Sequence, residues 1–289
     1  MAKPVRDLGA SVRARLLNLA REKNQAMDLV LTRYAIERLL YRLSISKHAD
    51  RFILKGAVLV TTWFDDPHRP TRDLDLLGFG DAAPEAMLAA FAEIAQVAAD
   101  DGLTFDTDSL GADLIREHLD YGGVRLKINA TLAVARIPVV IDVAFGDALE
   151  PGAEDVDLPV LLDFPRPHLR AYARETVIAE KFHAMVALGL ANSRMKDYYD
   201  IWMLSRMYEF DADRMVRALT ATFGRRGTEM PVGVPEGLST AFAASPRKQA
   251  QWTAFVRDLA VAAPSLEIVC EDIGAILIPL AAAARESRT

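Results

Sequence analysis

Apolar residues at helical spacing dominate the first part of the chain. Residues 11–20 and 27–43 repeat apolar side chains every three or four positions, which predicts two helices. The second segment carries two apolar stripes rotated from one another, so we expect it to be covered on more than one side. Arg33 and Arg42 stand among its polar positions.

Short apolar runs predict the strands that follow. Residues 51–54 form one run, and residues 73–77 form another that is apolar except for two carboxylates. Residues 124–130 alternate apolar and polar positions as a half-buried strand does, and a β-branched run follows at 138–145. We expect these last two to be antiparallel neighbours joined by a turn near residues 135–137.

The remaining pattern divides the chain into a mixed and a helical part. Further helices are predicted at 57–64 and 84–99, with loops at 65–71 and 147–158. The second part is helical throughout, with helices expected at residues 175–188, 195–208, 212–222, 246–262 and 265–283. The predicted fold class is α+β: residues 1–165 form a mixed-sheet domain that includes the N-terminal helices, and residues 166–289 form an α-helical bundle domain.

The composition narrows the function classes. With 289 residues and 51% hydrophobic side chains, the chain is neither disordered nor collagen-like. The lone cysteine, Cys270, cannot form an intramolecular disulfide, and no window approaches about 18 uninterrupted apolar residues, so we expect a cytoplasmic protein without a membrane span. No histidine spacing typical of a metal site occurs, and no G-x-S-x-G, Walker A or kinase motif supports acyl transfer or P-loop chemistry.

The net charge of −6 conceals a strong asymmetry. Residues 1–55 carry a net charge of +7, residues 56–163 of −15, residues 164–226 of +4 and the remainder of −2. The overall charge argues against a nucleic-acid partner, whereas two basic segments around an acidic middle permit one. Charge blocks are also common on solvated helix faces, so the asymmetry leaves both interpretations open.

Three carboxylates of the acidic middle suggest metal chemistry. Asp73 and Asp75 occupy positions i and i+2 of a predicted strand, so both leave the same face. Asp142 interrupts the apolar run 139–143, where an unpaired buried carboxylate would be costly. Three acids from two strands can converge on one side of a sheet and hold Mg²⁺ for phosphoryl transfer. The alternative is that the two acids of the Asp-Leu-Asp motif simply end a strand in solvent.

Basic and acidic residues elsewhere could complete such a site. The junction 54–57 runs from strand through Gly56 into a helix, where backbone amides can approach phosphate. Lys181 interrupts an apolar helical stripe and could hold a triphosphate or extend past a domain edge. Asp197 could act as a general base or as the partner of Lys181.

The helix start at residues 194–200 is ambiguous. Arg194 and Lys196 could bind phosphate, and Lys196 can pair with Asp200 at i, i+4. A structural ion-pair network explains these residues as well as a catalytic role does.

Taken together, these segments resemble the AbiEii/AbiGii toxin family of nucleotidyltransferases, which belongs to the DNA polymerase β-like superfamily and includes the MenT toxins. The resemblance spans about residues 50–205 and implies a nucleotidyltransferase-like mixed-sheet domain. It implies that Lys55, Gly56, Ala57, Arg72, Lys181, Arg194 and Lys196 bind nucleotide or phosphate, that Asp73, Asp75 and Asp142 bind metal, and that these three acids, Lys181 and Asp197 are catalytic. Gly56-Ala57 departs from the Gly-Ser of the superfamily, so a hydroxyl contact to phosphate is missing.

The expected function is Mg²⁺-dependent transfer of NMP from an NTP to RNA, with Mn²⁺ as an alternative ion. The resemblance implies the 3′ end of a tRNA as acceptor, a toxin of a type IV toxin–antitoxin (abortive-infection) system, and a cognate AbiEi-like antitoxin that regulates transcription. Arg125 and Lys127 are candidates for RNA contact. Two alternatives remain: transfer of NMP or phosphate onto a protein hydroxyl, for example of the antitoxin, and a catalytically silent nucleotide-binding partner module.

Overall fold

The chain folds into two compact units. The computed structural model describes residues 7–63, 72–115, 122–257, 259 and 262–287. Unit 1 comprises Met1–Gly146 and Glu154–Ala171, and unit 2 comprises Asp147–Ala153 and Tyr172–Thr289.

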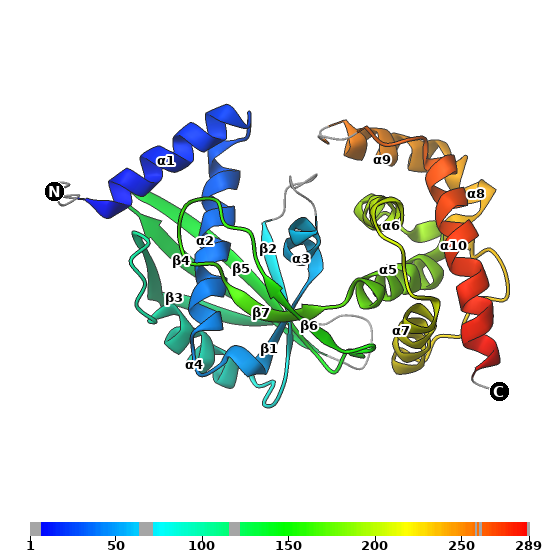
Figure 1. Ribbon diagram of the computed structural model, residues 1–289, viewed down its shortest axis with the longest axis horizontal. Coiled ribbons are helices and arrows are strands. Elements are labelled where there is room, and N and C mark those ends of the chain that lie inside the picture. The colour runs from blue at the N-terminus through cyan, green and yellow to red at the C-terminus, as the bar shows by residue number, and fades with distance from the viewer. Residues whose placement is uncertain (1–6, 64–71, 116–121, 258, 260–261, 288–289) are drawn as a thin grey trace. The chain divides into compact units, whose positions relative to one another are not determined.

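Unit 1 is built on a seven-stranded mixed sheet with the strand order β3-β4-β5-β2-β1-β7-β6 (Figure 1). Strand β1 runs antiparallel to β2 and parallel to β7, β2 runs parallel to β5, and β3, β4 and β5 are antiparallel neighbours. The strands are β1 (Phe52–Lys55), β2 (Asp73–Gly78), β3 (Leu103–Ile115), β4 (Gly123–Leu132), β5 (Ala135–Phe145), β6 (Ala153–Asp157) and β7 (His168–Tyr172). The predicted α+β class with a mixed sheet is confirmed.

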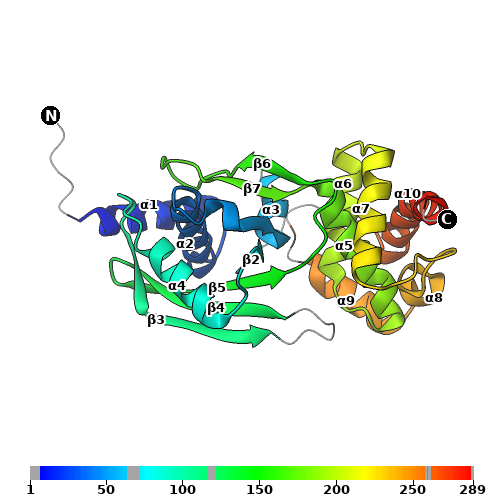
Figure 2. The ribbon, with the colours of Figure 1, turned by 90° about the horizontal axis from the view of Figure 1, so that it is seen from below.

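Helices cover the apolar face of this sheet. Helix α2 (Met27–Ser44) packs on β5, while α1 (Leu8–Glu22) and α4 (Pro84–Ala95) pack on β4 (Figure 2). The inward-facing residues of β4 and β5 are almost fully buried: Val124, Leu126, Ile128, Val139, Ile141 and Val143. The intervening polar positions leave the opposite face, so the alternation predicted for residues 124–130 is confirmed.

Helix α3 (Gly56–Thr62) follows β1 without a loop and packs on β1 and β2. The 3₁₀ turn η1 (Ala49–Arg51) precedes β1. The loop predicted at residues 65–71 lies outside the described residues.

The sequence pattern missed or misplaced some parts of the sheet. Strand β3 is an edge strand rich in polar residues, and its pairing with β4 shifts register between Asp106 and Gly111, which breaks any simple alternation. The turn between β4 and β5 lies at Ala133 and Val134, slightly before the predicted position. The predicted loop 147–158 contains β6, and β7 lies beyond residue 165 yet pairs with β1.

Unit 2 is helical, as the spacing predicts. Its helices are α5 (Arg174–Leu188), α6 (Met195–Met207), α7 (Ala212–Arg225), α8 (Thr240–Ala243), α9 (Pro246–Val256) and α10 (Leu266–Glu286), with 3₁₀ turns η2 (Gly189–Ala191) and η3 (Glu236–Leu238). Helix α7 packs on α5 and α10, and Cys270 of α10 is a buried free thiol. None of the described helices is long and apolar enough to cross a membrane.

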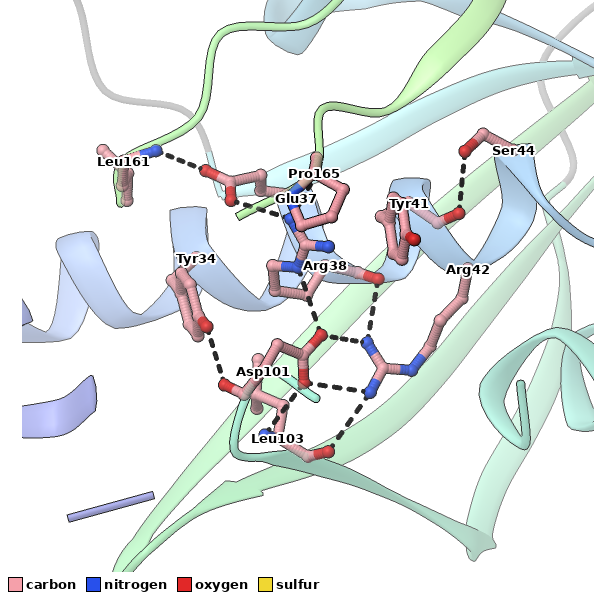
Figure 3. A network of polar contacts seen from close by, with 10 residues as sticks. All are labelled: Tyr34, Glu37, Arg38, Tyr41, Arg42, Ser44, Asp101, Leu103, Leu161 and Pro165. Carbon is pink, nitrogen blue, oxygen red and sulfur yellow. Dashed lines mark hydrogen bonds and ion pairs between the residues drawn. The ribbon is translucent and has the colours of Figure 1, made fainter. Parts of the chain in front are cut away.

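Within unit 1, a buried polar network joins α2 to Asp101, which lies between α4 and β3 (Figure 3). Arg42 donates to both carboxylate oxygens of Asp101, at 2.6 and 3.1 Å, and Arg38 Nε donates to Asp101 at 3.1 Å. Arg42, which the sequence placed among polar helix positions, is only 3% exposed. Because Asp101 belongs to a turn 59 residues away, the helix pattern gave no indication of this pairing.

Glu37 extends the network on the other side of α2. Its carboxylate accepts a hydrogen bond from the Leu161 backbone N–H at 2.7 Å and lies 3.4 Å from Arg38 Nη1. Burial raises the pKa of Glu37 to about 7, although the hydrogen bond from Leu161 and the charge of Arg38 act in the opposite direction.

Candidate active site

A row of charged residues crosses five strands of unit 1 at one level. Neighbouring strands pair Lys55 with Asp75, Asp75 with Asp142, Asp142 with Arg125, and Arg125 with Asp113. Directly paired residues project from the same face of a sheet, so these five side chains share a face. We refer to Lys55, Asp75, Asp142, Arg125 and Asp113 as the charged row.

The apolar core fixes the direction in which the row points. Leu74 and Leu76 flank Asp75 along β2 and are at most 1% exposed, and Ile141 and Val143 flank Asp142 in the same way. Asp73 lies two residues before Asp75, on the same face and exposed. The strand register thus brings three predicted site acids, Asp73, Asp75 and Asp142, to one side of the sheet, away from the core.

Arg125 holds Asp142 through both carboxylate oxygens. The Arg125 Nε atom donates to Asp142 Oδ1 at 2.8 Å, and Nη2 donates to Oδ2 at 2.7 Å. The hydrogen bonds to Asp142 raise the pKa of the Arg125 guanidinium, and the charges of Asp142, Asp73 and Asp75 raise it further. Arg125, a candidate for RNA contact in the sequence, therefore belongs to the acidic face itself. Lys127, the other such candidate, pairs with Asp113 at 2.8 Å.

The turn from β1 into α3 presses against Asp75. Gly56 has a φ angle of +70°, and a Cβ atom at this position would overlap the Asp75 carboxylate. Only glycine combines this backbone conformation with the missing Cβ atom that such an approach requires. Lys55, a member of the charged row, is the N-cap residue of α3, and the other two predicted phosphate-binding residues, Gly56 and Ala57, follow it as the first residues of that helix.

Arg72 directly precedes Asp73, the first residue of β2. It is exposed and donates from Nη2 to Asp28 Oδ2 at 2.7 Å. The hydrogen bond from Arg72 holds the pKa of Asp28 below its usual value.

Unit 2 contains the other predicted site residues. Lys181 of α5 contacts two carboxylates of α6, Asp197 Oδ1 at 2.5 Å and Asp200 Oδ2 at 2.9 Å. The three side chains are 13%, 6% and 2% exposed. Of the two roles considered for Asp197, the structure shows that of partner to Lys181. The partner shown for Asp200 is likewise Lys181, whereas the sequence offered Lys196.

The two remaining basic candidates stand at the start of α6. Arg194 and Lys196 are both exposed. Arg194 is the N-cap residue, and its backbone N–H donates to Asn192 Oδ1 at 2.8 Å. Asn192 therefore sets the turn that begins the helix, a contact that sequence spacing did not suggest.

A buried histidine in α5 was also unexpected. His183 Nε2 lies 2.8 Å from Thr228 Oγ1, and Arg226 Nη1 lies 3.2 Å from His183 Nδ1. Because Arg226 can only donate, Nδ1 accepts and the ring proton resides on Nε2. Burial lowers the pKa of His183 to about 4, and the charge of Arg226 acts in the same direction.

The donor chemistry of the acidic face suits a hard divalent cation. Carboxylate oxygens are the ligands that Mg²⁺ prefers, and the missing Cβ atom of Gly56 allows the turn to lie directly against the Asp75 carboxylate. Within the described ranges, no three Asp, Glu, His or Cys side chains are already arranged around a common metal position. Both oxygens of Asp142 accept hydrogen bonds from Arg125.

Comparisons with known proteins identify the family of this chain. Two crystal structures from Helicobacter pylori, one of a protein assigned as a nucleotidyltransferase and one of JHP933, align with 86% of this chain at 13% and 14% identity. The alignments cover 92% and 89% of those chains, each with a TM-score of 0.45. No curated protein matches the sequence. Residues 38–278 match the sequence profile described as nucleotidyl transferase AbiEii toxin, type IV toxin–antitoxin system. The chain that carries this acidic sheet face is therefore a member of the AbiEii nucleotidyl transferase toxin family.

Proposed function

We propose that this protein is a Mg²⁺-dependent nucleotidyltransferase that transfers NMP from an NTP to an RNA hydroxyl and acts as the toxin of its system. The observation that supports the proposal most directly is the shared face of Asp73, Asp75 and Asp142. Family membership supports nucleotidyl transfer and an antitoxin partner. Mn²⁺ can replace Mg²⁺ because both are hard, octahedral ions.

In this reaction the acceptor oxygen forms a bond to the α-phosphorus of the NTP, the bond between that phosphorus and the pyrophosphate oxygen breaks, and the hydroxyl proton passes to water. Asp73, Asp75 and Asp142 provide the oxygen ligands for the divalent cation. When bound, the cation supplies positive charge that lowers the pKa of the attacking hydroxyl and stabilises the leaving pyrophosphate.

Roles for the other candidates follow from their charge and position. The backbone at Gly56 and Ala57, together with Lys55 and Arg72, binds phosphate oxygens beside the carboxylates. In unit 2, Lys181, Arg194 and Lys196 bind the triphosphate and Asp197 is a catalytic residue. These unit 2 assignments rest on the family resemblance, because the structure shows Lys181 and Asp197 bound to each other.

We propose the 3′ end of tRNA as the acceptor. The two basic segments of the chain, with net charges of +7 and +4, and Lys127 on the open face are consistent with an RNA phosphate backbone. A second acceptor class is a protein hydroxyl, such as one of the antitoxin. Transfer to it needs the same metal chemistry and differs only in the molecule that receives the NMP.

One assay tests both acceptors. The purified chain is incubated with each α-labelled NTP, Mg²⁺, and either total tRNA or the antitoxin protein. We expect label in tRNA, loss of that label with EDTA or with Asp73→Ala, and wild-type activity of Asp108→Asn, which changes an exposed carboxylate of β3. Label that appears only in protein selects the second acceptor. Absence of Mg²⁺-dependent label, or label that survives Asp73→Ala, would contradict nucleotidyl transfer at this face.

A further inference from the structure

The charged row contains two basic residues among its carboxylates, Lys55 and Arg125. The three proposed cation ligands share this face with Asp113, and Arg125 lies beside Asp142 in the strand register. The Arg125 side chain is 44% exposed, so solvent reaches it, yet it makes two short hydrogen bonds to the two oxygens of Asp142, which is a bidentate contact.

The electrostatic reach of Arg125 extends beyond Asp142. The charges of Asp73 and Asp75 also act on its guanidinium, so Arg125 interacts with all three proposed cation ligands. A positive charge in this place repels a divalent cation that approaches the same carboxylates. At about 6 Å in a water-like dielectric, such a charge weakens the binding of a divalent ion about tenfold.

We infer that Arg125 is the resident counter-ion of the acidic face: it positions Asp142 and lowers the affinity of the three carboxylates for a free divalent cation. The cation is then bound firmly only when a nucleotide adds its own negative charge. This inference rests on the proposed function, because it takes Asp73, Asp75 and Asp142 as the cation ligands.

The geometry also indicates that Arg125 keeps its place when the cation binds. Each carboxylate oxygen has two lone pairs, so each Asp142 oxygen can accept from Arg125 and still have a second direction for a ligand. Arg125 is therefore a positioning residue, and it differs from a purely structural residue in one respect. Loss of a structural residue weakens metal binding, whereas loss of a counter-ion strengthens it.

The test measures Mn²⁺ binding to the full chain without nucleotide, by the electron paramagnetic resonance signal of the free ion. We expect Arg125→Gln to bind Mn²⁺ about tenfold more tightly than the wild type, because one opposing charge is removed. Arg125→Lys keeps the charge and should stay close to the wild type. Arg136→Gln is the charge-matched control: it removes an exposed cation further along β5 and should leave the affinity unchanged.

Asp75→Asn separates the two proposals. If Asp75→Asn binds Mn²⁺ as tightly as the wild type, or if the wild type does not consume any NTP, the proposed function fails. If binding depends on Asp75 but folded Arg125→Gln binds Mn²⁺ no more tightly than the wild type, only the role of Arg125 is overturned.

A measurement on the wild type covers the case in which Arg125→Gln does not fold. The side-chain Nε–H resonance of Arg125, assigned by its absence from Arg125→Lys, should remain protected from solvent exchange when Mg²⁺ is added. Loss of that protection on adding Mg²⁺ would mean that Asp142 leaves Arg125, and this would overturn the inference.

Discussion

Both units set a basic side chain against carboxylates, but they do so at very different depths. In unit 1, Arg125 and Asp142 are 44% and 20% exposed on an open sheet face. In unit 2, Lys181, Asp197 and Asp200 are 13%, 6% and 2% exposed between two helices. Water can replace a lost partner on the open face but not between the helices. Loss of a partner is therefore tolerated in unit 1, whereas the buried cluster of unit 2 depends on complete pairing.

Removal of Lys181 should have the largest effect on stability and tests whether the buried cluster depends on complete pairing. Lys181→Met leaves Asp197 and Asp200 buried without their shared cation, which should cost about 3 to 5 kcal/mol of unfolding free energy in urea. The control Lys196→Met, an exposed residue of the same helix start, should stay within about 0.5 kcal/mol of the wild type. A loss below about 1 kcal/mol for Lys181→Met would show that water enters the cluster.

Glu37 should make the stability of unit 1 depend on pH near neutrality. Its pKa is raised from 4.5 to about 7, so the folded state favours the neutral acid, and stability present below pH 4.5 is lost as the pH rises through 7. The loss should reach up to about 3 kcal/mol, at about 1.4 kcal/mol per pKa unit. Hydrogen exchange of α2 amides between pH 4.5 and 8, corrected for intrinsic rates, measures it. Glu37→Gln should remove this dependence, whereas the exposed control Glu22→Gln should retain it.

His183 should give unit 2 the opposite response. Its pKa is lowered from 6.5 to about 4, so stability present above pH 6.5 is lost as the pH falls through 4, again by up to about 3 kcal/mol. His183→Gln keeps a donor for Thr228 but cannot be protonated, so amides of α5 should lose this acid sensitivity. The exposed His168→Gln serves as the control. An α5 that loosens at alkaline pH would contradict the assignment.

The smallest stability effect concerns the glycine turn. Gly80→Ala, at a φ of +86°, should cost about 1 to 2 kcal/mol because of its positive φ alone, and Gly56→Ala should cost more because its Cβ atom would also overlap Asp75. Only the first substitution places a methyl group against Asp75, since nothing lies within 4 Å of a Cβ at Gly80. Nucleotidyl transfer should therefore fall in Gly56→Ala and persist in Gly80→Ala. Equal activity of the two variants would show that the Gly56 turn is not part of the active site.

The sequence predicted those features that depend on local pattern. Alternation located β4, a β-branched run located β5, and Asp142 stood out because it interrupts that apolar run. The register between strands has no local signature, so the sequence could not show that Arg125 faces Asp142. Arg38 was not predicted to be buried for the same reason, because its partner Asp101 lies 63 residues away.

The charged row also has a consequence for folding fidelity. Its five members come from residues 55 to 142 and meet only when every strand pair adopts the native alignment. A shift of β5 by one position would drive Asp142 into the apolar layer and turn Ile141 toward water. Each such shift would bury a carboxylate without a partner in the core, which costs free energy. The charged row therefore favours the native strand alignment over misaligned ones, independently of any role in substrate binding.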